Sequence, residues 1–279
     1  MRLTLLGVRG STPAPGADFV RYGGHTSCAV VSVDDDPPTL VLEAGTGIRT
    51  LSRRLGGASF RGDLIFTHLH WDHVQGLPFS SAIDHPDSVV RAHIPVEAEG
   101  DDPVETFARA MSPPNFPIGP EGLLGRWEFL PLLPGPVSLA DDRLQVTAAR
   151  IRHKGGPTYG LRVTGPGGES AAYLPDHLLL SADDADAVAL VAGVDVLLHD
   201  AQFTAAEAAR AEEYGHTTLD VAVAYADRCD VRELVMLHHH PDRTDAEIDA
   251  LASDLTQTPG GRPVRFAAEG DVIEVGLGR

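Results

Sequence analysis

The stretch THLHWDH, residues 67–73, places four metal-competent side chains within six residues, directly after the apolar run 64–66. If that run is a strand, His68 and His70 project to the same side, because alternate residues of a strand share a face. Asp72 and His73 then fall where the chain turns, so the ligands of one turn can serve two metal ions. Imidazole and carboxylate suit zinc, manganese or iron. A His-rich surface loop is the alternative, but ligands packed this tightly after a buried strand favour a metal site.

The totals describe a large globular chain. Its 279 residues suffice for one big domain or two small ones. No stretch approaches the ~18 apolar residues of a membrane span, and the first residues are too short an apolar run for a signal peptide. The only cysteines, Cys28 and Cys229, do not suggest a disulfide framework. A reducing cytoplasm is therefore the expected location, with no membrane contact.

The charge balance limits the partners that the chain can bind. Forty acidic residues stand against 22 basic ones, for a net charge of −18. A field of this sign repels phosphate backbones and argues against an extended nucleic-acid partner. It does not argue against a small anion that local metal ions hold.

The order of predicted elements indicates the fold class. Apolar alternation predicts mostly strands in the first half, at 2–8, 28–33, 39–42, 64–66, 88–94, 144–152, 159–163 and 171–174. Helices and strands then alternate, with helices at 181–192, 204–214, 217–229 and 244–255 and strands at 194–198, 233–237, 265–267 and 272–275. This order suggests two sheets packed together with helices outside, and no linker-like boundary divides residues 1–279.

Residues 95–136 differ in character from the rest. They contain a predicted helix at 104–111 and then the proline-rich stretch 112–120, which cannot continue a helix or a central strand. We expect an insertion over one side of the core, as a lid or as a plain surface loop. Phe107, Phe116 and Trp127 are available there to line an apolar pocket wall.

Further polar residues stand where predicted strands end. His153, Asp176, Asp200 and His238 each follow a strand, and His216 stands at a helix start. A polar group terminating each of four strands suggests that these ends converge on one site.

At this point the sequence resembles a known family. The motif His68-x-His70-x-Asp72-His73, followed by Gly76, resembles the signature of the metallo-β-lactamase fold. The branch with ribonuclease Z and related phosphodiesterases is the nearer likeness, through the loops 7–13, 43–47, 198–201 and 215–218. The resemblance implies a four-layer αββα sandwich and two divalent metal ions, with zinc expected and manganese or iron as alternatives.

The resemblance also implies how the ligands divide between the two ions. It places the last ligand directly after an apolar strand, which favours His238 over His239 and His240. The implied set is His68, His70 and His153 for the first ion, Asp72, His73 and His238 for the second, and Asp176 as the bridge.

The same likeness suggests a mechanism. A two-metal site can activate water and clamp the oxygens of a phosphodiester, and Asp72 would also orient the attacking water. His216, oriented by Asp200, is the expected proton donor to the leaving group. Asp200 departs from the glutamate that is usual in that segment, and Glu43 departs from the usual aspartate.

The expected function is that of a metal-dependent phosphodiesterase acting on a small phosphodiester such as a cyclic nucleotide. Three alternatives stay open: a tRNA 3'-processing-type ribonuclease, a lactonase or thioesterase of the same fold, and a non-enzymatic metal-bound sensor or binding module. The related branch also suggests a homodimer, although no stretch reads as an interface.

Overall fold

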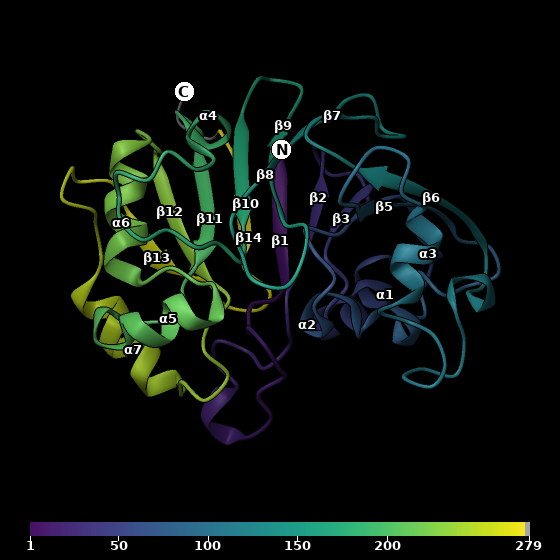
Figure 1. Ribbon diagram of the computed structural model, residues 1–279, viewed down its shortest axis with the longest axis horizontal. Coiled ribbons are helices and arrows are strands. Elements are labelled where there is room, and N and C mark those ends of the chain that lie inside the picture. Colours follow the sequence, from purple (N-terminus) through teal and green to yellow (C-terminus); the bar gives the residue numbers. More distant parts are fainter. Residues whose placement is uncertain (277–279) are drawn as a thin grey trace.

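The computed structural model in Figure 1 describes residues 1–276 and contains two seven-stranded sheets that face each other. The first sheet has the order β14-β1-β2-β3-β4-β5-β6. Its strands are β1 (Arg2–Gly7), β2 (Cys28–Ser32), β3 (Leu40–Leu42), β4 (Arg61–Ile65), β5 (Val89–Pro95), β6 (Arg126–Leu132) and β14 (Val272–Glu274). Antiparallel pairs join β14 through β3, and parallel pairs join β3 through β6.

The second sheet has the order β13-β12-β11-β10-β9-β8-β7. Its strands are β7 (Gly135–Val137), β8 (Gln145–Arg150), β9 (Tyr159–Thr164), β10 (Ser170–Leu174), β11 (Val196–Asp200), β12 (Glu233–Leu237) and β13 (Val264–Phe266). Strands β10 to β13 run parallel. Their carboxyl ends therefore lie at one edge of the sheet, which is where ligand-binding residues of open α/β sheets gather.

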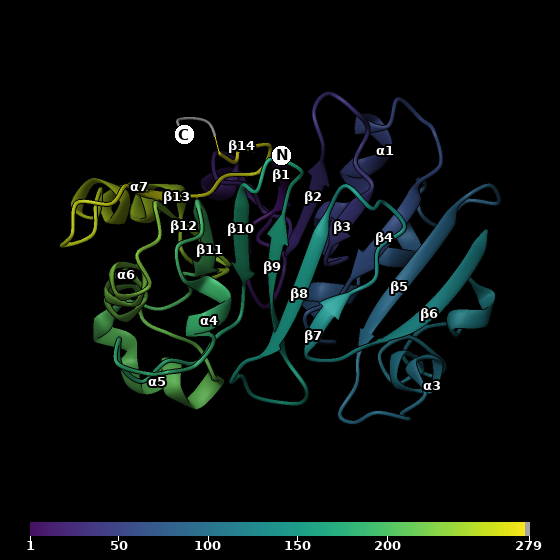
Figure 2. The same cartoon turned by 90° about the horizontal axis from the view of Figure 1, so that it is seen from above.

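Helices cover the outer face of each sheet, as Figure 2 shows from above. The helices α1 (Leu51–Arg54), α2 (Trp71–Val74) and α3 (Pro103–Ala108) lie with the first sheet, and α4 (Val188–Val191), α5 (Ala208–Tyr214), α6 (Leu219–Arg228) and α7 (Asp245–Asp254) with the second. One buried apolar cluster fills the space between the sheets, and two further clusters lie outside them. The predicted αββα sandwich is confirmed.

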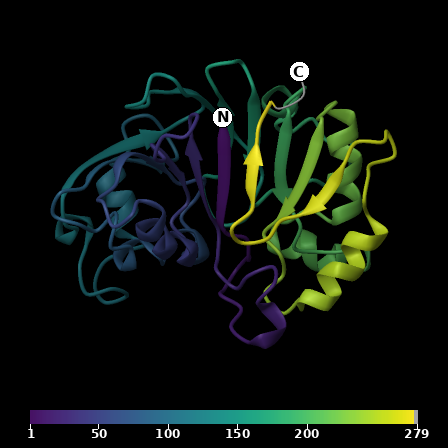
Figure 3. The same cartoon turned by 180° about the vertical axis from the view of Figure 1, so that it is seen from behind.

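The two ends of the described chain meet in one sheet. Figure 3 shows the C-terminal strand β14 beside the N-terminal strand β1, and Leu3 pairs with Ile273 in antiparallel register. The last strand thus closes the first sheet rather than the second, which a local reading of the sequence does not predict.

The insertion predicted at 95–136 is shorter than expected. Residues 126–132 form β6, which pairs in parallel with β5 as the edge of the first sheet. Pro131 is compatible with that place, because an edge strand leaves one row of N–H groups unpaired. The chain between the two strands, residues 96–125, is what remains outside the sheet.

The helix predicted at 181–192 is also wrong over most of its length, since only Val188–Val191 is helical. Asp186 Oδ2 accepts hydrogen bonds from the backbone N–H of Arg152 (2.9 Å) and from its Nε (3.2 Å). Ala187 has a left-handed φ of 54°, which does not continue a helix. Tertiary contacts of the aspartates therefore override the helical pattern.

Within residues 1–276, no helix is both long enough and apolar enough to cross a membrane.

Candidate metal centre

The THLHWDH stretch leaves β4 and turns into α2 at the edge between the sheets. The backbone N–H of Thr67 donates to Glu43 Oε1 (2.9 Å), and its carbonyl accepts from Tyr159 N (2.9 Å). His70 has extended φ and ψ immediately before the helix, so Asp72 and His73 lie in its first turn. The stretch is therefore held from both sheets at once.

Strand ends supply the remaining histidines and the second aspartate. His153 lies beyond β8, Asp176 beyond β10 and His238 directly after β12. His238 has a left-handed φ of 60°, a strained conformation for a residue other than glycine. The bend directs its ring to the cluster, whereas His239 Nε2 lies 2.8 Å from the carbonyl of Ala267.

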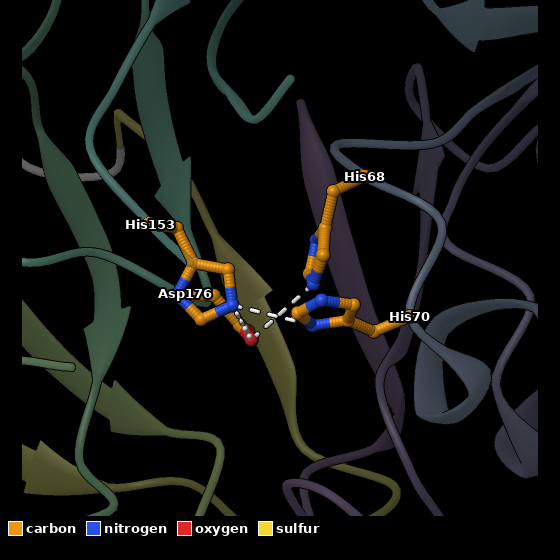
Figure 4. Close-up of side chains that lie close together, drawn as sticks. All are labelled: His68, His70, His153 and Asp176. Carbon is orange, nitrogen blue, oxygen red and sulfur yellow. Dashed lines mark hydrogen bonds and ion pairs between the residues drawn. The ribbon is translucent and has the colours of Figure 1, made fainter. Parts of the chain in front are cut away.

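Four side chains form a first group, drawn in Figure 4. Asp176 Oδ2 lies 3.4 Å from Nε2 of His68 and 3.4 Å from Nε2 of His153, and His153 Nε2 lies 3.3 Å from His70 Nδ1. Each of the four can direct one ligand atom to a common point, because these atoms lie within 4.8 Å of one another.

A second group lies on the other side of the same carboxylate. Asp176 Oδ1 is 3.3 Å from His73 Nε2 and 3.0 Å from His238 Nε2. Asp72 Oδ2 approaches the same two nitrogens, at 3.3 Å and 3.2 Å. The two oxygens of Asp176 thus face two different groups, which is the arrangement of a bridging carboxylate.

The donor set fits two divalent cations. The atoms Nε2 of His68, Nε2 of His73 and Oδ1 of Asp176 are buried and face other atoms of the cluster, but none of them makes a hydrogen bond with a described residue. Buried polar atoms without partners are rare in native proteins, and an unaccounted ion is one of their explanations. The two groups together contain five imidazoles and two carboxylates, which are donors that zinc, manganese and iron accept.

The pKa shifts of the cluster residues also bear on metal binding. Burial holds the pKa of His68 well below its usual value, so its ring is the neutral form that binds metals. Burial opposes ionisation of Asp176, but His238, His73 and His68 outweigh it and hold its pKa well below the usual range. Burial lowers the pKa of His73, but the carboxylates of Asp72 and Asp176 outweigh this effect and raise it. The same carboxylates would attract a divalent cation, which competes with the proton for the ring nitrogen of His73.

Two residues support the groups from behind. Glu43 is fully buried, and its Oε1 lies 3.5 Å from His73 Nδ1. The backbone N–H of Ser11 donates to Asp72 Oδ2 (2.7 Å). The sequence predicts Glu43 in a supporting loop, but it does not predict the role of Ser11. A backbone donor carries no side-chain signal, and only the glycine-rich loop around it was visible.

His216 and Asp200 lie at the margin of the cluster. His216 Nδ1 is 2.7 Å from Asp200 Oδ2, and Asp200 is fully buried. Burial lowers the pKa of His216, but the carboxylate of Asp200 outweighs it and raises the pKa to about 9. The His216 ring lies 5.4 Å from that of His238, centroid to centroid. The shorter aspartate therefore reaches the imidazole in this chain, and the structure brings His216 and Asp200 together with the seven expected ligands. Of the three aromatic residues expected in a pocket wall, Phe116 lines a cavity, whereas Phe107 and Trp127 do not line the cavities near the cluster.

Comparison with known proteins agrees with this geometry. The sequence model of the Beta-lactamase superfamily domain matches residues 41–239. A protein named Ribonuclease Z from Metallosphaera sedula is 30% identical over 232 residues, covering 72% of this chain and 78% of that protein. Another Ribonuclease Z, from Deinococcus radiodurans, is 34% identical over 128 residues, which are 45% of this chain and 38% of that protein, so this match spans less than half of either.

Solved structures share the fold over the whole chain. The metallo-beta-lactamase fold protein YhfI from Bacillus subtilis has a TM-score of 0.70 at 17% identity and covers 98% of this chain and 99% of its own. A diphosphatase from the PhnP family has a TM-score of 0.69 at 20% identity, covering 98% and 97%. The short form of human tRNase Z has a TM-score of 0.62 at 20% identity, covering 99% and 100%. At these identities the likeness shows the fold alone.

The chain belongs to the metallo-β-lactamase superfamily, in its ribonuclease Z-like branch, and is a metal-dependent hydrolase.

Proposed function

We propose that this protein is a phosphodiesterase that cleaves a small phosphodiester, such as a cyclic nucleotide, with the help of two divalent metal ions. The observation that carries the proposal is the Asp176 carboxylate, whose oxygens each face a separate group of ligand atoms. The first ion would be held by His68, His70 and His153, the second by Asp72, His73 and His238, and Asp176 would be shared.

Zinc is the metal that we propose, because five of the six unshared donors are buried or half-buried imidazoles that lie close together. When bound, two such ions supply Lewis-acid chemistry, which activates water and neutralises charge on the phosphoryl oxygens. The protein residues hold the donors in place and keep bulk water from the buried side of the cluster.

The chain supplies the proton transfers. Asp72, fixed by the Ser11 N–H, presents an ionised carboxylate that can accept a hydrogen bond from the attacking water. His216 retains its proton near neutral pH because Asp200 stabilises the imidazolium. It can give that proton to a departing alkoxide, and Asp200 keeps the ring in the required orientation.

A small substrate agrees with the charge of the protein. The net charge of −18 disfavours long phosphate backbones. The relatives named Ribonuclease Z favour the second candidate, a ribonuclease acting on tRNA precursors. Both candidate functions use the same cluster. They differ in the length of nucleic acid that the protein surface must bind.

Both cysteines are free and buried, which is consistent with the proposed cytoplasmic location.

The proposed homodimer would be tested by light scattering of the purified protein, where a monomeric mass excludes it.

One assay separates the candidates. The zinc- or manganese-loaded protein is offered bis(p-nitrophenyl) phosphate, cyclic nucleotides, a lactone panel and precursor tRNA. We expect turnover of the diesters, lost in Asp72→Ala and His68→Ala but kept in the control His85→Ala, a half-buried histidine outside the cluster. Lactone turnover without diester cleavage would reject the proposal, and faster cleavage of precursor tRNA would favour the ribonuclease.

A further inference from the structure

A cleft leads away from the proposed metal centre. A cavity of about 240 Å³ is lined by residues that include His68, His70, Trp71 and Arg109. A second cavity of about 280 Å³ is lined by Trp71, Phe79, Phe116 and Asn115. Trp71 and Ala110 line both cavities, so the cleft continues from the cluster past the indole ring into an apolar recess.

The aromatic residues of this cleft are unusually open to solvent. Trp71 is 70% exposed and Phe79 is 62% exposed. Phe79 packs edge-on against Phe116, with ring centroids 5.9 Å apart. Exposed aromatic side chains grouped at a concave surface are typical of ligand sites. Trp71 directly precedes Asp72 and His73 in α2, so its indole is carried on the same turn as two proposed ligands.

Polar groups of the cleft indicate what kind of ring it would accept. The amide side chains of Gln75 and Asn115 line the recess together with the aromatic rings. An acyl chain cannot form hydrogen bonds with amide groups. A planar heterocycle can stack on an indole and form hydrogen bonds at its edges.

Arg109 lines the cavity that His68 and His70 also line, and it brings a positive charge there. Arg109 is 77% exposed, and its ion pair with Glu105, at 3.7 Å, is between two exposed side chains. Such pairs contribute little to stability, so the guanidinium can turn to an anion at small cost. In a chain with a net charge of −18, an arginine beside the proposed catalytic cluster suits an anionic substrate.

We propose that Trp71, with Phe79 and Phe116, forms a subsite for the aromatic heterocycle of a phosphodiester substrate. The ring lies against the indole, its polar edge faces Gln75 and Asn115, and Arg109 contacts the phosphate group. This inference rests on the proposed phosphodiesterase function and specifies its substrate class as heteroaryl esters, of which nucleotides are the common form.

Binding of products tests the subsite without requiring turnover. The chain has two tryptophans, and Trp127 packs on Phe129 at 5.7 Å in the edge strand, away from both cavities. Trp127→Phe therefore leaves Trp71 as the only indole reporter. Zinc-loaded Trp127→Phe protein is titrated with AMP, with ribose 5-phosphate and with octyl phosphate, while Trp71 fluorescence is recorded.

We expect saturable quenching by AMP and a Kd roughly 5-fold or more below that of ribose 5-phosphate, since stacking on one aromatic ring contributes about 1–3 kcal/mol. In calorimetry, Trp71→Ala with unchanged zinc content should remove that preference, while Trp127→Phe should keep it. Equal Kd values for AMP and ribose 5-phosphate, or an unchanged AMP affinity in Trp71→Ala, would overturn the proposal. Tightest binding of octyl phosphate would overturn it in favour of an acyl pocket.

Turnover separates this proposal from the one on which it rests. On diester substrates Trp71→Ala should raise KM for nucleoside esters and leave KM for glycerophosphoethanolamine unchanged. If no diester is hydrolysed by the wild-type protein, the proposed function fails, but the AMP preference still decides whether the subsite exists.

Discussion

At the scale of single residues, the contact between His216 and Asp200 supports the proton donor that we propose for the leaving group. Their contact of 2.7 Å is buried, and it keeps the imidazole protonated against the effect of burial. A leaving alkoxide requires that proton, whereas p-nitrophenolate is stable enough to depart without it. The two kinds of ester therefore report separately on His216 and on the proposed metal centre.

We predict that Asp200→Asn narrows the pH range of alkyl-ester cleavage. In the wild type, the pKa of His216 is raised from 6.5 to about 9, so the donor is present at neutral pH and is lost as the pH rises through 9. The amide cannot stabilise the imidazolium, and burial then lowers the pKa. The alkaline limb of kcat for a nucleoside diester should move below neutral pH.

The control for this prediction compares two substrates with different leaving groups. His216→Ala should lower kcat for the nucleoside diester by about 100-fold, a typical contribution of a general acid, with little effect on bis(p-nitrophenyl) phosphate and on zinc content. An Asp200→Asn profile that matches the wild type would rule out this role of the pair.

At the scale of elements, the position of α2 depends on close backbone packing between Gly76 and the segment 44–45. The N–H of Gly76 donates to the carbonyl of Ala44 (2.9 Å), and Ala44 N–H donates to the carbonyl of His73 (2.7 Å). A Cβ on Gly76 would lie 2.1 Å from the carbonyl oxygen of Gly45. The glycine after the histidine motif is thus required by packing, and the packing sets where Asp72 and His73 stand.

We predict that Gly76→Ala destabilises the protein by about 1–3 kcal/mol, as overpacking against a rigid backbone does. The shift of α2 should also weaken zinc affinity. Urea unfolding and competition with a chelator measure the two effects.

Gly167→Ala is the matched control, because its Cβ would meet only the carboxylate end of Glu169, a flexible side chain. It should leave zinc affinity unchanged. Equal behaviour of the two variants would show that the α2 contact is not critical.

At the scale of the whole molecule, the proposed centre joins the two sheets. His68 and His73 come from the first sheet, while Asp176 and His238 come from the second. A cation bound by both would favour the assembled sandwich over the unfolded chain, because it binds only where the sheets meet.

We predict that removal of metal lowers the Tm by roughly 5–10 °C relative to protein with free zinc at about 100 times its Kd. Differential scanning calorimetry after chelation, with zinc or manganese added back, measures this change. Asp176→Asn should respond weakly to zinc, whereas His85→Ala should respond as the wild type does. A Tm that does not depend on metal in the wild type would contradict a centre that spans both sheets.

The sequence by itself determined the features that depend on neighbours along the chain. Most of the strands, the helix starts at Thr204 and Thr244, and the placement of His68 to His73 after a buried strand follow from short spacings. The family motif then allowed the sandwich and the group of converging residues to be predicted. These parts were accessible because periodicity and capping are local physical effects.

Only the tertiary structure decided the features that depend on residues far apart in the chain. The Asp72–His238 contact joins positions 166 residues apart, and the Ser11 N–H reaches Asp72 across 61 residues. Edge strand β6 and the loss of helix at 181–187 likewise depend on distant partners. The cleft past Trp71 exists because α2 and residues 103–116 meet in space, and no local pattern specifies which surfaces will face each other.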